Sequence, residues 1–137
     1  MRTFDFHRPK LAYDILRYVL AVEFLSHTVT RMATDRVTAF GVFLQGAGFP
    51  VGIAWAWGVT LWELVGGILL IAGWRTPWVA MVFVVQMIFA IFLVHLKFGW
   101  FVVGHGSNGI EYAICIAAMC LAAAFTAPRR DAAPASD

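Results

Sequence analysis

One stretch of the sequence decides the fold: Trp62-Glu63-Leu64-Val65-Gly66-Gly67-Ile68-Leu69-Leu70-Ile71-Ala72-Gly73-Trp74-Arg75. It places one carboxylate among apolar residues, follows it with a pair of glycines and ends at an arginine. An acidic side chain at the centre of a membrane-spanning helix costs about 3 kcal/mol on insertion scales. Glu63 is therefore expected to have a polar partner inside the protein.

The composition of the whole chain extends this interpretation. Of the 137 residues, 61% are hydrophobic and 13% are charged, whereas soluble domains have a charged fraction of about 25%. A soluble chain of this length cannot bury so much apolar surface, so the lipid bilayer is its expected solvent. The net charge is only +2 and the cations are scattered, which excludes the basic patch that nucleic acid requires.

Four apolar segments are predicted to cross the membrane as helices, at residues 11–31, 51–73, 77–96 and 109–125. A hydrocarbon core of about 30 Å needs about 20 helical residues. The connection at 32–50 suits a short amphipathic helix at the membrane interface. The predicted fold is thus all-α, an integral membrane four-helix bundle with a short interfacial helix between spans one and two. Residues 1–10 are expected to form a cytoplasmic tail, 11–126 the bundle, and 127–137 a disordered cytoplasmic tail.

Basic residues predict the orientation of the four spans, because cytoplasmic ends of membrane helices are enriched in Lys and Arg. Four spans place both termini on one side. That side carries Arg2, Arg8, Lys10, Arg75, Arg129 and Arg130, and the other carries Arg31, Arg36 and Lys97. We therefore expect a multi-pass protein of the bacterial inner membrane with both termini in the cytoplasm.

Depth in the bilayer sorts the polar residues into two layers. A rise of 1.5 Å per residue puts Arg17, Glu63 and Gln86 roughly 9 to 13 Å above the inner edge. An ion pair between Arg17 and Glu63, with Gln86 beside it, is the simplest way to satisfy the carboxylate. A second layer opens towards the outer side, and it contains Glu23, His27, His95, His105 and Glu111.

Each layer has a structural and a functional interpretation. In the inner layer, the pair of Arg17 and Glu63 fixes the register of two helices, or the Glu63 carboxylate carries a proton or binds a quinol. The outer layer is a polar network without a ligand, a site for a quinone head group, or, with less support, a site for a divalent metal held by imidazole and carboxylate. The chain has no iron–sulfur cysteines and no nucleotide motif. Electron transfer would therefore need a bound quinone, a metal or another subunit.

The order and spacing of several short motifs resemble the DoxX family of small four-span membrane proteins, over about residues 11–125. The strongest is Glu63-x-x-Gly66-Gly67 followed by Gly73-x-Arg75. The supporting motifs are Leu16-Arg17, His27 with Arg31, Phe49-Pro50 and Asn108-Gly109-x-Glu111. One departure is Thr28 after His27, where family members often have His-Gly.

The resemblance implies a four-helix membrane bundle. Some members are subunits of quinone-linked sulfur oxidation systems such as thiosulfate:quinone oxidoreductase, and others are associated with complexes that handle thiol and oxidative stress. The expected function is therefore a membrane subunit of a quinone-linked redox system with a membrane or redox protein as partner. A small-solute carrier and an assembly subunit are the alternatives. Catalysis by this chain itself and the formation of a homo-oligomer are left open.

Overall fold

The computed structural model describes residues 8–104 and 106–128. These residues form five α-helices, and no strand occurs among them: α1 (Pro9–Ala33), α2 (Val37–Gly46), α3 (Gly52–Ala72), α4 (Thr76–Ala90) and α5 (Glu111–Thr126). A π-helical turn η1 (Ile91–His95) and a 3-10 turn η2 (Leu96–Phe98) continue α4. The all-α class expected from the sequence is confirmed.

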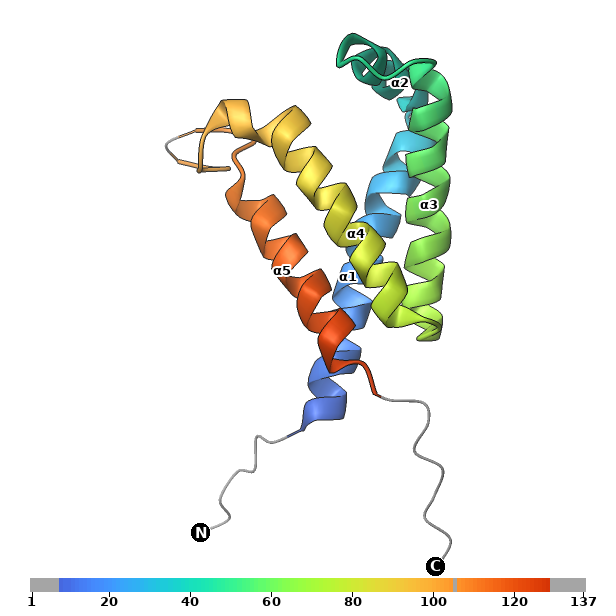
Figure 1. Cartoon of the computed structure of the whole chain (residues 1–137), viewed down its shortest axis with the longest axis vertical. Coiled ribbons are helices and arrows are strands. Elements are labelled where there is room, and N and C mark those ends of the chain that lie inside the picture. The colour runs from blue at the N-terminus through green and yellow to red at the C-terminus, as the bar shows by residue number, and fades with distance from the viewer. Residues whose placement is uncertain (1–7, 105, 129–137) are drawn as a thin grey trace, which may run out of the picture.

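The helices pack as two antiparallel pairs. α1 lies along α3 and α4 lies along α5, while α2 crosses the end of α3. Figure 1 shows the two pairs meeting near the turn between α3 and α4 and separating towards α2, so that the molecule is V-shaped. The start of α1, the end of α5 and the α3–α4 turn lie at one end, which we call the terminal end; the opposite end is the α2 end.

Aromatic stacking joins the two pairs. The rings of Phe24 on α1 and Phe83 on α4 stack with their centroids 3.6 Å apart, and both side chains are almost fully buried. Small residues make room for this contact, because Phe83 lies over Gly66 and Leu25 lies over Gly67. The glycine pair of the deciding stretch thus lets α1 and α4 approach α3 closely, as small residues do in membrane bundles.

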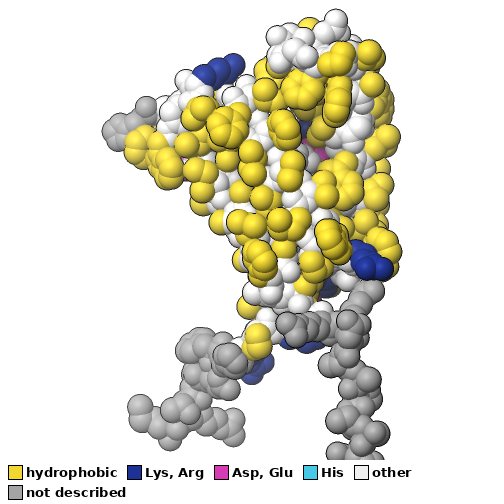
Figure 2. Space-filling view, viewed as in Figure 1, with side chains coloured by type: hydrophobic (Ala, Val, Ile, Leu, Met, Phe, Trp, Pro, Cys, Tyr) yellow, Lys and Arg dark blue, Asp and Glu magenta, His cyan; other side chains and the backbone are white. Residues whose placement is uncertain are grey.

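Two helical stretches are long and apolar enough to cross a bilayer, namely Gly52–Ala72 and Thr76–Phe98. α5 has only 16 residues, and α1 carries charges along its length. Figure 2 shows apolar side chains covering most of the visible face. Soluble monomers rarely expose large continuous apolar patches. The exposed apolar side chains of α3 and α4 include Leu61, Val65, Ile68, Val82, Val85 and Phe89.

Candidate functional site

Glu63 lies near the middle of α3 and its carboxylate is almost fully buried. Arg31 of α1 donates a hydrogen bond from one guanidinium nitrogen to Glu63 Oε2 at 2.8 Å. Gln86 of α4 donates from Nε2 to Glu63 Oε1 at 2.7 Å. The carboxylate is thus held by a cation from one neighbouring helix and an amide from another. We call Arg31, Glu63, Gln86 and Thr60 the Glu63 cluster.

The partner of Glu63 is therefore Arg31, and the expected ion pair between Arg17 and Glu63 does not form. The expected pair between Arg17 and Glu63 required the start of α1 and the end of α3 to lie at the same depth in the bilayer. Figure 1 instead shows the first turns of α1 extending past the α3–α4 turn. Arg17 contacts the end of α3, about 11 Å along the helix axis from Glu63. Helical side chains also lean towards their own N-terminus, so Arg31 reaches back along α1 to the carboxylate.

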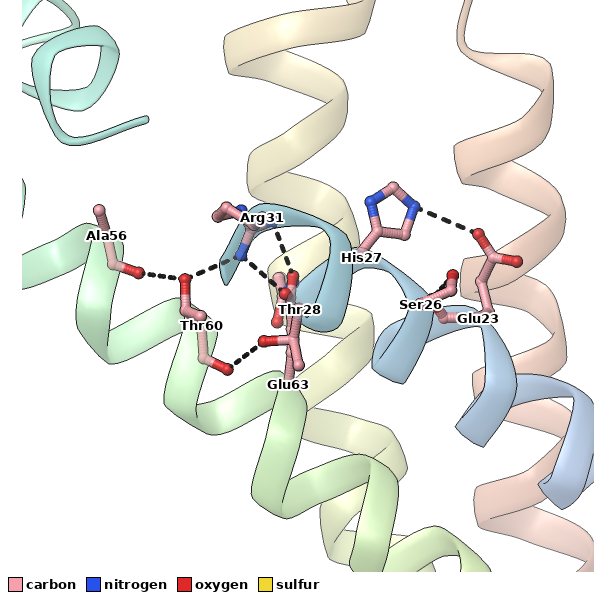
Figure 3. A network of polar contacts seen from close by, with 9 residues as sticks. Glu23, Ser26, His27, Thr28, Arg31, Ala56, Thr60 and Glu63 are labelled. Atoms are coloured by element: carbon pink, nitrogen blue, oxygen red, sulfur yellow. Dashed lines mark hydrogen bonds and ion pairs between the residues drawn. The ribbon is translucent and has the colours of Figure 1, made fainter. Parts of the chain in front are cut away.

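Three side chains fix Arg31, namely Glu63, Thr60 and Phe40, and Figure 3 shows the first two. The nitrogen that binds Glu63 also donates to Thr60 Oγ1 at 3.0 Å, and the Thr60 hydroxyl donates to the carbonyl of Ala56 at 2.7 Å. The guanidinium lies 4.6 Å from the centre of the Phe40 ring on α2. Thr28 on α1 donates to the carbonyl of Thr60. These contacts tie α1, α2 and α3 together around one cation.

Sequence reasoning missed Thr28 and Phe40 as neighbours of this cluster. Two sequence spacings are consistent with the cluster, because Thr60 lies three residues before Glu63 and Arg31 lies four residues after His27, so each pair shares one helix face. The helical period places Arg31 on the same face of α1 as His27, and this spacing is the sequence feature that favours Arg31 as the partner of Glu63. Nothing in the sequence indicated that α2 would lay Phe40 against the guanidinium.

Arg17 has a separate role at the terminal end. Its guanidinium donates to the carbonyls of Leu70 and Ile71 in the last turn of α3 and to Asp14 Oδ1 at 3.2 Å. The last four carbonyls of a helix have no partner within it, and a cation there is also favoured by the helix dipole. Arg17 thus caps α3 from the neighbouring helix.

We predict that Arg17→Leu lowers the free energy of unfolding by about 1.5–3 kcal/mol, because hydrogen bonds from a charged donor are lost and the buried Leu70 carbonyl is left without this partner. Denaturation in mixed micelles measures this change. Arg75→Leu is the matched control, since Arg75 is an exposed cation in the adjacent turn. Equal effects of the two substitutions would show that Arg17 does not cap α3.

The residues of the expected outer layer separate in the structure. His27 Nε2 lies 3.3 Å from Glu23 Oε1 on the same face of α1, and the Tyr112 hydroxyl of α5 interacts with the Glu23 carboxylate. His95 instead contacts the carbonyl of Asn108 at 2.8 Å.

Glu111 accepts a hydrogen bond from the backbone N–H of Val102 at 2.8 Å, and His105 lies outside the described residues. His95 and Glu111 thus order the connection between η2 and α5 through contacts with its backbone. Within residues 8–104 and 106–128, no three His, Cys, Asp or Glu side chains are placed to hold a metal ion.

Comparison with known proteins gives one match. The family model described as DoxX matches residues 12–96, which include nearly all of α1 and the whole of α2, α3 and α4. The chain belongs to the DoxX family. No curated protein and no solved structure matches it. The DoxX match and the two long apolar helices together indicate a membrane protein, and the match contains the whole Glu63 cluster.

Proposed function

We propose that this DoxX protein spans the bacterial inner membrane four times, through α1, α3, α4 with its η1 and η2 continuation, and α5. α2 then lies at the outer interface and both termini are cytoplasmic. The pairing of Arg31 with Glu63 supports this orientation, because it offsets part of the positive charge on the outer side. The exposed apolar side chains of α3 and α4 would face lipid.

Within the membrane, the proposed function is that of a subunit in a quinone-linked redox system concerned with thiol, sulfur or oxidative stress chemistry. One observation carries this proposal: a carboxylate is buried halfway along α3 and held by Arg31 and Gln86. Ionisable groups inside membrane helices are costly and usually functional.

The residues around Glu63 fit a quinone head group. Such a group needs hydrogen-bonding partners for its two oxygens and an apolar sleeve. Among the described residues, Trp62 Nε1 and Gln86 Oε1 are buried without a hydrogen-bond partner. The indole N–H can donate to an oxygen of the quinone, and the amide oxygen can accept from a hydroxyl of the reduced quinol. The Trp62 ring packs against Phe83 with the ring centroids 5.4 Å apart. A bound quinone would supply a lipid-soluble carrier of electrons and protons. Glu63 would hold the proton, and Gln86 and Trp62 would orient the head group.

We predict that Glu63→Gln weakens the binding of a short-chain quinone at least about tenfold, because the neutral amide no longer pairs with Arg31 or holds a proton. Quenching of tryptophan fluorescence in purified protein measures this binding, and circular dichroism checks the fold. Glu111→Gln is the matched control, since the same chemical change is made at a carboxylate that only orders a loop. Unchanged quinone binding, folding and redox activity in Glu63→Gln would remove the proposal.

The same purified protein separates the two alternatives. Uptake of a small solute into liposomes, without a quinone absorbance band, would favour a carrier. A protein partner retained through detergent extraction, again without quinone, would favour an assembly subunit. The open V of the two helix pairs (Figure 1) gives such a partner a surface to contact, whereas the polar cluster gives a quinone its hydrogen bonds.

A further inference from the structure

A second site, with a largely apolar wall and a few polar groups, lies beside the Glu63 cluster on the outer side of Arg31. It is an open pocket of 440 Å³ between the last turns of α1 and the first turns of α2. Its lining combines cationic, hydroxyl and imidazole groups with one aromatic ring, contributed by Ser26, His27, Thr30, Arg31, Arg36 and Phe40. Neither Glu63 nor any other carboxylate lines this pocket.

The electrostatics of the pocket favour an anion. One nitrogen of Arg31 binds Glu63 and Thr60 on the inner side, while the second makes only a long contact of 3.5 Å with Glu63. Within the described part of the chain, the Arg36 side chain makes no ion pair, and neither arginine pairs with Asp35. Glu23 is engaged by His27. The pocket therefore presents guanidinium groups whose charge is incompletely balanced, and guanidinium groups bind phosphate oxygens well.

The surroundings of the pocket favour an anion that carries apolar chains. A large apolar side chain, that of Phe43, is exposed one turn further along α2 on the same face as the pocket-lining Ala39 and Phe40. In the proposed placement this side chain lies at the outer membrane interface, where α2 rests on the lipid. A free anion would leave this apolar surface uncovered, whereas the acyl chains of a phospholipid would cover it.

We propose that the pocket between α1 and α2 binds the phosphate of an anionic phospholipid, with Arg36 and Arg31 as the ligating side chains and the hydroxyl of Thr30 beside them. This site is distinct from the Glu63 cluster but shares Arg31 with it. The inference uses the proposed membrane placement and does not depend on the redox role. Retention of the protein in alkali-washed membranes tests that placement separately.

Arg36→Gln tests the site in the full-length protein, purified and delipidated in a neutral detergent. Native mass spectrometry measures the binding of phosphatidylglycerol and of zwitterionic phosphatidylcholine. We expect one phosphatidylglycerol per chain, bound about tenfold more tightly than phosphatidylcholine, and we expect Arg36→Gln to abolish this preference. Lys97→Gln is the matched control, because it removes an exposed cation from the same side of the membrane and should keep the preference.

Other outcomes would overturn the proposal. Equal losses in Arg36→Gln and Lys97→Gln would show that lipid adheres only through general charge. Binding of inorganic phosphate with the same dependence on Arg36, without a preference between the two lipids, would identify a site for a free anion instead. Thr30→Val provides a second variant that leaves both arginines in place. It should weaken phosphatidylglycerol binding several-fold, and an unchanged affinity in both Thr30→Val and Arg36→Gln would contradict the site.

Discussion

Arg31→Met is expected to lower the free energy of unfolding by about 3–5 kcal/mol, because it leaves Glu63 buried without its cation. The loss is large because the carboxylate side chain is only 4% exposed and water cannot replace the guanidinium. The contact between Arg31 and the Phe40 ring is lost as well, which adds to the effect. Reversible unfolding in mixed micelles, followed by far-ultraviolet circular dichroism, measures the change.

Lys10→Met is the control for this prediction. Lys10 also pairs with a carboxylate, that of Asp14 at 3.1 Å, but its side chain is 86% exposed. Exposed pairs contribute about 0–1 kcal/mol, so Lys10→Met should change the stability little. If Arg31→Met were as mild as Lys10→Met, Glu63 would be protonated or hydrated in the folded protein and the pair would not stabilise the fold.

Gly66→Ala is expected to destabilise the protein by about 1–3 kcal/mol, because the added methyl group overfills the core. A Cβ at this position would lie 2.6 Å from Cζ of Phe83. Phe83 cannot move aside easily, since its ring is fully buried and stacks on Phe24. The substitution should therefore push α4 away from α3 and also lengthen the hydrogen bond from Gln86 to Glu63.

Gly58→Ala is the matched control, on the same helix and with the same added methyl group. A Cβ at position 58 would meet nothing within 4 Å, and alanine is favoured over glycine in a helix by about 1 kcal/mol. Gly58→Ala should therefore be neutral or stabilising in the same unfolding measurement. Equal behaviour of the two variants would show that the close approach of α4 to Gly66 is absent.

The residue ranges of the helices could be predicted from the sequence, because apolar runs and turn residues are local features of the chain. The apolar runs, the interfacial segment and the turn at Gly73–Arg75 correspond to α1, α2, α3, α4 and α5 within a few residues. Gly73 ends α3 with φ of +67°, a conformation that glycine adopts without strain. The contact between Gln86 and Glu63 was also predictable, since the short α3–α4 turn fixes the register of these two helices.

The partner of Glu63 was not predictable from depth alone. The register of α1 against α3 depends on packing between segments separated by a long connection, and the sequence contains no short turn that sets it. α1 begins at Pro9 and extends past the end of α3, which moves Arg17 to the carbonyls of Leu70 and Ile71. The expected outer layer separated for a related reason, because His95 and Glu111 contact the backbone of their own connection.

A pair of double-mutant cycles tests whether Arg31 rather than Arg17 holds the buried carboxylate. The free energy of unfolding is measured for Arg31→Met, Glu63→Met and their combination, and the same is done with Arg17→Met in place of Arg31→Met. We predict a coupling energy of about 2–3 kcal/mol between Arg31 and Glu63, and less than about 0.5 kcal/mol between Arg17 and Glu63. A larger coupling with Arg17, or none with Arg31, would contradict the Glu63 cluster.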